Sequence, residues 1–241
     1  CLYPNNDAYM GACIYVIQNN NTSVEATGNT FNGDNAYAFN LGNGNPLTES
    51  DNIDNTKYVV AKIGDAYYTS IQDAIEAAQD GETVRLIQNV KMDTKTLATQ
   101  NDGYAVLVNV NGKKVTIDLN GKKITVNAAA ADLAAAKGKM LLAVFSADLG
   151  GHLTLTDNSD AKNGAVTLNV NDAKVYSMFV SESKESDKSN SGKLTVNGGN
   201  YTTVGNVSNA MFFTDANEVI TVNGGNFYCD GATTTASYPW M

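Results

Sequence analysis

The chain has 241 residues and a mass of 25.5 kDa, with 43% hydrophobic and 17% charged residues. This composition is typical of a chain that buries a core, in one elongated domain or two small ones. The net charge of −9 disfavours nucleic-acid binding, and without an apolar run of about 18 residues we predict no membrane insertion.

Residues 1–40 carry a β-strand pattern ahead of the main repeat. The segment from Val24 to Phe31 resembles a degenerate copy of that repeat. We interpret residues 1–40 as the end of a preceding module or as strands that dock elsewhere. Because the chain begins at Cys1 without a signal peptide, we expect a mature or excised fragment. A lipidated Cys1 is the alternative interpretation.

Residues 41–55 are polar and rich in turn formers, so we interpret them as a linker that precedes a domain over residues 56–241. A helix is expected next, with Thr69 as N-cap and Gln72 three residues later in a capping box. Gly81 is expected to end the helix. Four apolar residues form its buried stripe, namely Ile71, Ala74, Ile75 and Ala78. A strand over residues 83–90 follows, so the helix suits a cap over the first of several stacked strands.

An internal repeat occupies the rest of the chain. Each copy reads apolar–Thr–apolar and then Asp, Asn or Thr before a turn. The copies are Val115-Thr116-Ile117-Asp118, Leu153-Thr154-Leu155-Thr156, Leu194-Thr195-Val196-Asn197 and Ile220-Thr221-Val222-Asn223. The last two lie 26 residues apart, and each continues through Gly-Gly-Asn to an aromatic residue, Tyr201 or Phe227.

Other apolar runs precede the copies and predict further strands. They cover residues 13–17, 105–110, 141–145, 178–180 and 211–213. Third strands are expected at residues 123–126 and 166–170. An alanine-rich stretch at residues 128–137 suggests a second helix, and the polar residues 181–192 suggest a solvated loop.

A unit of this kind cannot bury its apolar face alone, whereas stacked units can. Alternation places Val115 and Ile117 on the inner face and the repeat threonines in an outer row, with asparagine amides stacked from coil to coil. We therefore predict an all-β fold, a right-handed parallel β-helix of five or six coils with a short N-terminal capping α-helix. The dipeptides Asn111-Gly112 and Asn120-Gly121 are typical of hairpins, so an antiparallel β-sandwich stays the alternative.

The segment Tyr68-Thr-Ser-Ile-Gln-Asp-Ala-Ile-Glu-Ala-Ala-Gln-Asp-Gly-Glu-Thr-Val-Arg-Leu-Ile-Gln-Asn-Val90 closely resembles the start of right-handed β-helix modules with the pectin-lyase-like fold. Such modules are common in large surface proteins of gut-type bacteria, and the Val-Asn-Gly-Gly-Asn copies resemble their coils. The resemblance covers about residues 56–231. It implies extracellular exposure and frequent glycan contact, and it assigns no catalytic residue.

Candidate catalytic groups are few. If the chain is an enzyme, the residues to test are Asp118, Asp157 and Asp160, since glycosidases use two nearby carboxylates. Turn aspartates are more often turn formers, and Arg85 and His152, the only arginine and histidine, are expected to be structural. No metal centre is predicted. Weak Ca²⁺ ligation is the one cofactor to consider, through Asp157, Asn158 and Asp160.

Exposed aromatic rings would suit a glycan ligand, and we single out Tyr201, Tyr228 and Trp240. Cys13 and Cys229 are expected to be buried thiols. The first functional hypothesis is a non-catalytic extracellular module on a bacterial cell surface, a stalk or adhesin that contacts glycans or a host or cell-surface protein. A polysaccharide lyase or glycoside hydrolase is one alternative. A self-assembling fibre or phage-fibre subunit, joined by strand addition, is the other.

Overall fold

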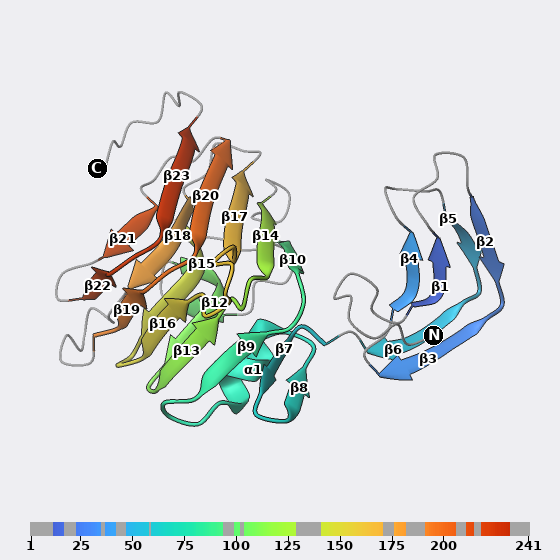
Figure 1. Cartoon of the computed structure of the whole chain (residues 1–241), viewed down its shortest axis with the longest axis horizontal. Coiled ribbons are helices and arrows are strands. Elements are labelled where there is room, and N and C mark those ends of the chain that lie inside the picture. The colour runs from blue at the N-terminus through green and yellow to red at the C-terminus, as the bar shows by residue number, and fades with distance from the viewer. Residues whose placement is uncertain are drawn as a thin grey trace. The chain divides into compact units, whose positions relative to one another are not determined.

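The computed structural model describes residues 12–16, 23–34, 37–41, 47–57, 59–93, 99–101, 104–128, 141–170, 176–181, 191–205, 211–214 and 218–231. The chain divides into two compact units, unit 1 over Cys1–Val59 and unit 2 over Val60–Met241 (Figure 1). Within the described residues, α1 (Ile71–Ala77) is the one α-helix among many strands. The prediction of an all-β fold with a short helix is therefore confirmed.

The described residues of unit 1 form three pairs of parallel strands. The pairs are β1 (Ala12–Val16) with β4 (Tyr37–Leu41), β2 (Val24–Thr27) with β5 (Leu47–Ser50), and β3 (Thr30–Asp34) with β6 (Ile53–Lys57). The chain thus passes through the same three positions twice. Residues 12–34 form the first passage and residues 37–57 the second.

The predicted linker, residues 41–55, contains β5 and part of β6. Its strands escaped prediction because they hold few apolar residues, and hydrophobic alternation is the main sequence signal for a strand. Backbone pairing does not need that signal. Asn52 strengthens the pairing of the two passages, because its Nδ2 donates to the carbonyl of Ala26 at 2.9 Å and its Oδ1 accepts from the Asn29 backbone N at 3.0 Å.

Three sheets build unit 2, and we call them sheets I, II and III. Sheet I has seven strands, in the order β22 (Val219–Val222), β19 (Lys193–Val196), β16 (His152–Thr156), β13 (Lys114–Asp118), β9 (Thr83–Leu86), β7 (Ala61–Ile63) and β8 (Ala66–Tyr68). Sheet II has β10 (Val90–Asp93), β14 (Lys123–Ala128), β17 (Ala165–Val170), β20 (Asn200–Gly205) and β23 (Asn226–Gly231). Sheet III has β11 (Thr99–Asn101), β12 (Tyr104–Asn111), β15 (Leu141–Asp148), β18 (Tyr176–Ser181) and β21 (Phe212–Thr214).

From β9 onward the chain visits sheets I, II and III in that order, and we call each such passage a circuit. Each return adds one parallel strand beside the strand of the previous circuit. Sheet II has five strands, one for each circuit. This order is compatible with a solenoid. It contradicts the antiparallel sandwich, because Asn111-Gly112 and Asn120-Gly121 join strands of different sheets rather than the two arms of a hairpin.

Alternation along sheet I follows the repeat. Val115 and Ile117 are buried, as predicted, and so are their equivalents in the next two circuits. The repeat threonines lie opposite one another in register, and Thr83 of β9 extends the row. The row is Thr83, Thr116, Thr154, Thr195 and Thr221. Asparagine pairs also form between circuits, at exposed rather than buried positions, such as Asn223 Nδ2 to Asn197 Oδ1 at 2.8 Å.

Helix α1 covers the first circuit. Its N-cap is Ser70, one residue after the predicted Thr69, because the Ser70 hydroxyl accepts from the Asp73 backbone N at 3.0 Å. The helix ends at Ala77, ahead of the predicted Gly81. The predicted stripe is correct in that Ile71, Ala74, Ile75 and Ala78 are all buried.

Gln72 on α1 has a role that the capping-box interpretation missed. Its Oε1 accepts from the Asn109 backbone N at 2.9 Å, and its Nε2 donates to the Asn109 carbonyl at 3.3 Å. One side-chain amide therefore pairs with β12 as a neighbouring strand would. Of the second predicted helix, residues 128–137, only Ala128 is described, and it ends β14; residues 182–190 of the predicted loop also lie outside the described residues.

We predict that Gly151→Ala destabilises unit 2 by about 1–3 kcal/mol, the usual range for overpacking. A Cβ at Gly151 would lie 2.0 Å from the backbone O of Val110 in the preceding circuit. Gly198→Ala is the matched control, since its Cβ would meet its nearest neighbour, the backbone N of Asp157, at 3.8 Å. Urea unfolding followed by circular dichroism measures both variants, and equal midpoints would contradict the prediction.

Candidate functional site

The turns between sheets I and II, here called the I–II turns, hold the carboxylates that the sequence singles out. Asp118 ends β13, and Asp157 follows β16 in the next circuit. Because Asp118 is in register with Thr156, parallel pairing brings the two aspartates to neighbouring turns. The question is whether their oxygens are free to act on a substrate.

Asp118 holds two turns together. Its side chain is buried, and Oδ1 accepts from the backbone N of Asn120 at 3.0 Å and of Asn158 at 2.9 Å. Its Oδ2 lies 3.8 Å from Nε of Arg85, which also donates to Asn120 Oδ1 through Nη2. Arg85 is therefore a half-exposed partner of this turn, in keeping with the structural role expected for it.

Asp157 is engaged even more fully. Oδ1 accepts from the backbone N of Gly121 at 2.9 Å, the backbone N of Ser159 at 3.2 Å and the Ser159 hydroxyl at 2.8 Å. Oδ2 accepts from the backbone N of Gly164 at 2.6 Å. Burial raises the pKa of Asp157, but the hydrogen bonds from Ser159, Gly121 and Gly164 outweigh it and leave the pKa lowered.

This arrangement suits structure better than acid–base or metal chemistry. A general acid needs a raised pKa, whereas Asp157 has a lowered one. Ca²⁺ would have to replace backbone donors on both Asp157 oxygens, so the weak calcium hypothesis does not fit this turn. Asp160 is exposed. Among the described residues, no cluster of three or more acidic, cysteine or histidine side chains is placed to hold a metal ion.

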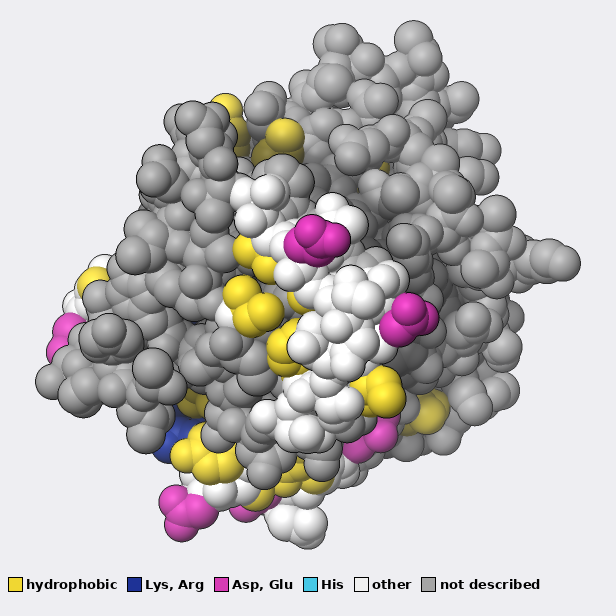
Figure 2. All heavy atoms as spheres, turned by 90° about the vertical axis from the view of Figure 1, so that its right-hand side faces the viewer, with side chains coloured by type: hydrophobic (Ala, Val, Ile, Leu, Met, Phe, Trp, Pro, Cys, Tyr) yellow, Lys and Arg dark blue, Asp and Glu magenta, His cyan; other side chains and the backbone are white. Residues whose placement is uncertain are grey.

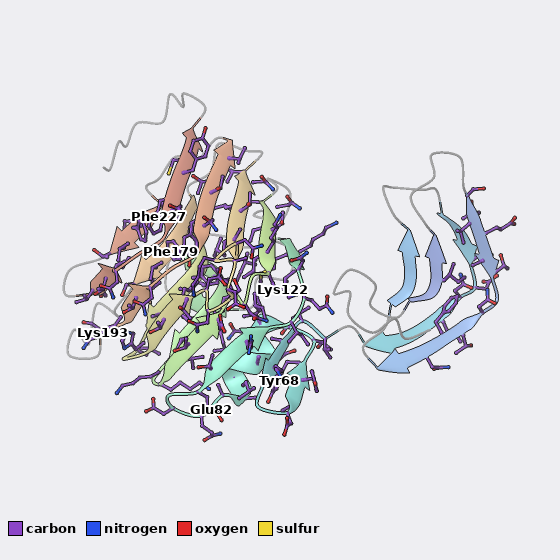
Figure 3. The ribbon with its side chains drawn as sticks, viewed as in Figure 1. Tyr68, Glu82, Lys122, Phe179, Lys193 and Phe227 are labelled. Atoms are coloured by element: carbon purple, nitrogen blue, oxygen red, sulfur yellow. The ribbon has the colours of Figure 1, made fainter. Side chains whose placement is uncertain are left out.

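Tyr201 corrects the expectation of a ligand-facing ring. Its side chain is buried, and its hydroxyl donates to the Gly198 carbonyl at 2.7 Å. Its ring stacks on Phe227 with centroids 5.3 Å apart and packs edge-on against Phe179 at 5.0 Å (Figure 3). Burial and the neighbouring Asp157 raise the pKa of Tyr201 above its ordinary value. Tyrosine at this position is a core residue, as aromatic residues at turns usually are.

The last circuit carries most of the exposed large apolar side chains of the described residues. We call this set the terminal strip, and it consists of Val219, Val222, Phe227 and Tyr228. Tyr228 is 62% exposed, so it stays a candidate ligand contact. Cys229 is an exposed free thiol, which corrects the prediction that it is buried. Trp240 lies outside the described residues.

A basic row borders the threonine row of sheet I. Lys114, His152 and Lys193 are in register on successive strands. His152 Nε2 lies 2.9 Å from the Thr195 hydroxyl. Partial burial lowers the pKa of His152, and the positive charges of Lys193 and Lys114 lower it further. The folded chain therefore favours the neutral imidazole.

We expect this histidine to give the protein a measurable pH dependence. Between its lowered folded pKa and its ordinary value of 6.5, the unfolded state binds more protons, so stability rises with pH in that window. His152→Gln should keep a hydrogen-bonding group and lose this part of the rise. Urea midpoints at several pH values from 5 to 7.5 (a window bracketing the ordinary histidine pKa of about 6.5) measure the effect. Parallel curves for both proteins would contradict it.

The structural roles of two residues were not found from the sequence alone. Asn120 links Arg85 to the Leu86 carbonyl, and Gln72 pairs with β12. The Asn120-Gly121 dipeptide signalled a turn, and Asn120 has a positive φ of 49°, but only the strand order shows what that turn joins. For Gln72, no local signal separates a capping box from a contact with residue 109.

Searches of protein-family models, curated proteins and solved structures found no significant match to this chain. Among the described residues, no helix is long and apolar enough to cross a membrane. We therefore infer the function from the geometry of the I–II turns and of the last circuit.

Proposed function

We propose that unit 2 is a right-handed parallel β-helix of the pectin-lyase-like type, and that the chain is a non-catalytic extracellular module on a bacterial cell surface. Its role would be that of a stalk or adhesin, with glycans or surface proteins as partners. One observation carries the non-catalytic part. Asp118 and Asp157 are the two buried candidates for catalysis, and their carboxylates accept hydrogen bonds from backbone N–H groups. That of Asp118 also pairs with Arg85.

The repeating order of sheets supports the β-helix, because each circuit buries its apolar residues only against its neighbours. The charged and polar side chains described on the surface suit a module surrounded by solvent. On the face shown in Figure 2, acidic side chains lie among uncharged polar ones, with hydrophobic side chains between them. This is consistent with the net charge of −9.

Glycan contact has two supports on the described surface. The threonine row offers regularly spaced hydroxyls on one face of sheet I, and Tyr228 offers an exposed ring beside the last circuit. Hydroxyl arrays and aromatic faces are the groups that sugar rings use for hydrogen bonding and stacking. The enzyme alternative has less support because both oxygens of Asp157 accept backbone hydrogen bonds and the buried Asp118 is paired with Arg85.

The test is a glycan-array screen of the full chain, with product release from the same polysaccharides measured in parallel. We expect binding without product, or neither. Tyr228→Ala should weaken any binding that uses the exposed ring. Tyr67→Ala should not, because Tyr67 is an exposed tyrosine on β8 of sheet I, away from the last circuit. Product release that Asp118→Asn or Asp157→Asn abolishes, with the fold retained, would overturn the proposal.

A further inference from the structure

The end strands at the two ends of unit 2 differ in how they are paired and covered. At the first circuit, β7 lies antiparallel on β9, β8 lies antiparallel on β7, and Gln72 pairs with the backbone of β12. At the other end, β21 of the fourth circuit and β22 and β23 of the last circuit are the end strands of their sheets. No described strand lies beyond them. Unpaired strand edges are templates for another chain.

Side chains at inner positions are exposed in the last circuit, whereas their equivalents in the previous circuit are buried. Val196 and Tyr201 of the previous circuit are 0% and 1% exposed. Their in-register equivalents, Val222 and Phe227, are 47% and 37% exposed. These residues belong to the inner rows, so the exposure comes from the missing neighbour and not from an outward position.

Unit 1 presents a matching edge. Its first strands β1, β2 and β3 have partners on one side only among the described residues. The spacing from Val24 to Phe31 equals that from Ile220 to Phe227. Ala26 and Phe31 are buried, so they occupy inner positions of unit 1. The β2–β3 segment therefore has the strand–turn–aromatic pattern that the next circuit after β22 and β23 would need.

Hydrogen-bond direction matches at one position of the turn. At the first residue of these turns, the later circuit donates to the earlier one: Asn223 Nδ2 donates to Asn197 Oδ1, and Ser50 Oγ donates to Thr27 Oγ1 at 3.3 Å. Thr27 occupies the position equivalent to Asn223. Its hydroxyl, which accepts from Ser50, keeps a proton with which to donate to Asn223 Oδ1 of another molecule.

We propose that two copies of this chain join end to end, with the β1–β3 edge of one copy pairing in parallel with the β21–β23 edge of the next. Phe31 would stack beside Phe227, Ala26 beside Val222, and Thr27 beside Asn223. The inference deepens the proposed β-helix fold by naming a partner for its last circuit, and it is independent of any glycan ligand. Because each copy offers one edge of each kind, the contact is head-to-tail and leaves an edge of each kind free on a pair, so that further copies can add.

The first test is the mass of the full chain by light scattering and sedimentation from micromolar to millimolar concentration. We expect mass to rise with concentration. Val222→Lys, which puts a charge on the edge, should weaken association by about tenfold or more, as edge lysines do in natural sheets. Tyr67→Lys is the matched control, because Tyr67 is 54% exposed on β8 at the opposite end of sheet I. A strictly monomeric wild-type chain would overturn the proposal.

The second test checks the register. If Phe31 lies beside Phe227, then residue 33 lies beside Cys229, with Cα atoms about 4.8 Å apart, within disulfide range. In a background lacking Cys1 and Cys13, Gly33→Cys should give disulfide-linked oligomers through Cys229 on oxidation. Asn32→Cys, whose side chain lies on the other face of β3, should not. Equal cross-linking of both variants, or of neither, would refute this pairing, while the β-helix fold and glycan results would stand unaffected.

Discussion

Asp157→Ala should unfold at a markedly lower urea concentration than the wild type, with a loss of about 3–5 kcal/mol. The reason is that three backbone N–H groups, those of Gly121, Ser159 and Gly164, lose their acceptor. Each buried donor left unsatisfied costs about 1–3 kcal/mol, and some of this is recovered when water enters. Asp160→Ala is the control, because that side chain is exposed and should change stability by about 0.5 kcal/mol or less.

Asp157 should also contribute to acid sensitivity. Its folded pKa is lowered from the ordinary value of 3.8, so its stabilising effect is complete above that value and is lost as pH falls through the folded pKa. Asp157→Asn should remove this part of the acid dependence while keeping one acceptor oxygen. Unfolding curves at pH values on both sides of 3.8 distinguish the variants. If Asp157→Asn lost as much stability in acid as the wild type does, other carboxylates would be the cause of the acid sensitivity.

Phe179→Ala should cost about 3–5 kcal/mol, the range for emptying a buried phenylalanine site. Phe179 is fully buried, stacks between Phe145 at 5.8 Å and Phe212 at 4.8 Å, and meets the edge of Tyr201 (Figure 3). Its removal breaks two aromatic stacks at once. Thermal and urea unfolding measure the loss.

Two variants separate the stack from simple burial. Phe179→Leu keeps much of the volume and should cost less than Phe179→Ala. Phe227→Ala should also cost less in the isolated chain, because that ring is 37% exposed although it contacts Tyr201 and Phe212. If Phe227→Ala proved as damaging as Phe179→Ala, the ring would have to be covered by another molecule under the conditions of the experiment.

The local chemistry of the repeat predicted much of unit 2. Apolar–Thr–apolar alternation fixed which residues of β13, β16 and β19 are buried, because side chains in a strand alternate strictly between its faces. The equal spacing after Leu194 and Ile220 predicted their pairing, and the structure has those two residues in register. The handedness of the proposed β-helix and the identity of any ligand stay predictions.

Other features depend on contacts that are distant in the sequence. Tyr201 and Tyr228 follow the same kind of turn, yet one is buried and the other exposed, because residue 201 points inward and residue 228 outward from a different strand. Nothing in the composition around Asp157 reveals that its partners are residues 121 and 164. Strands β5 and β6 were not predicted because their pairing depends on backbone hydrogen bonds and short polar side chains, which give no hydrophobic alternation in the sequence.

The circuits keep their register although their lengths differ. Ile124 pairs with Val166, 42 residues later, whereas Leu194 pairs with Ile220, 26 residues later. Strands are held in register by pairing, so variation in length falls on the connections. The I–II turns share in it, since residues 197–199 form one of them and residues 157–164 another. Segments there can be gained or lost during evolution without shifting one partner along a strand. A scaffold of this kind can diversify what it displays while its core pattern stays constant.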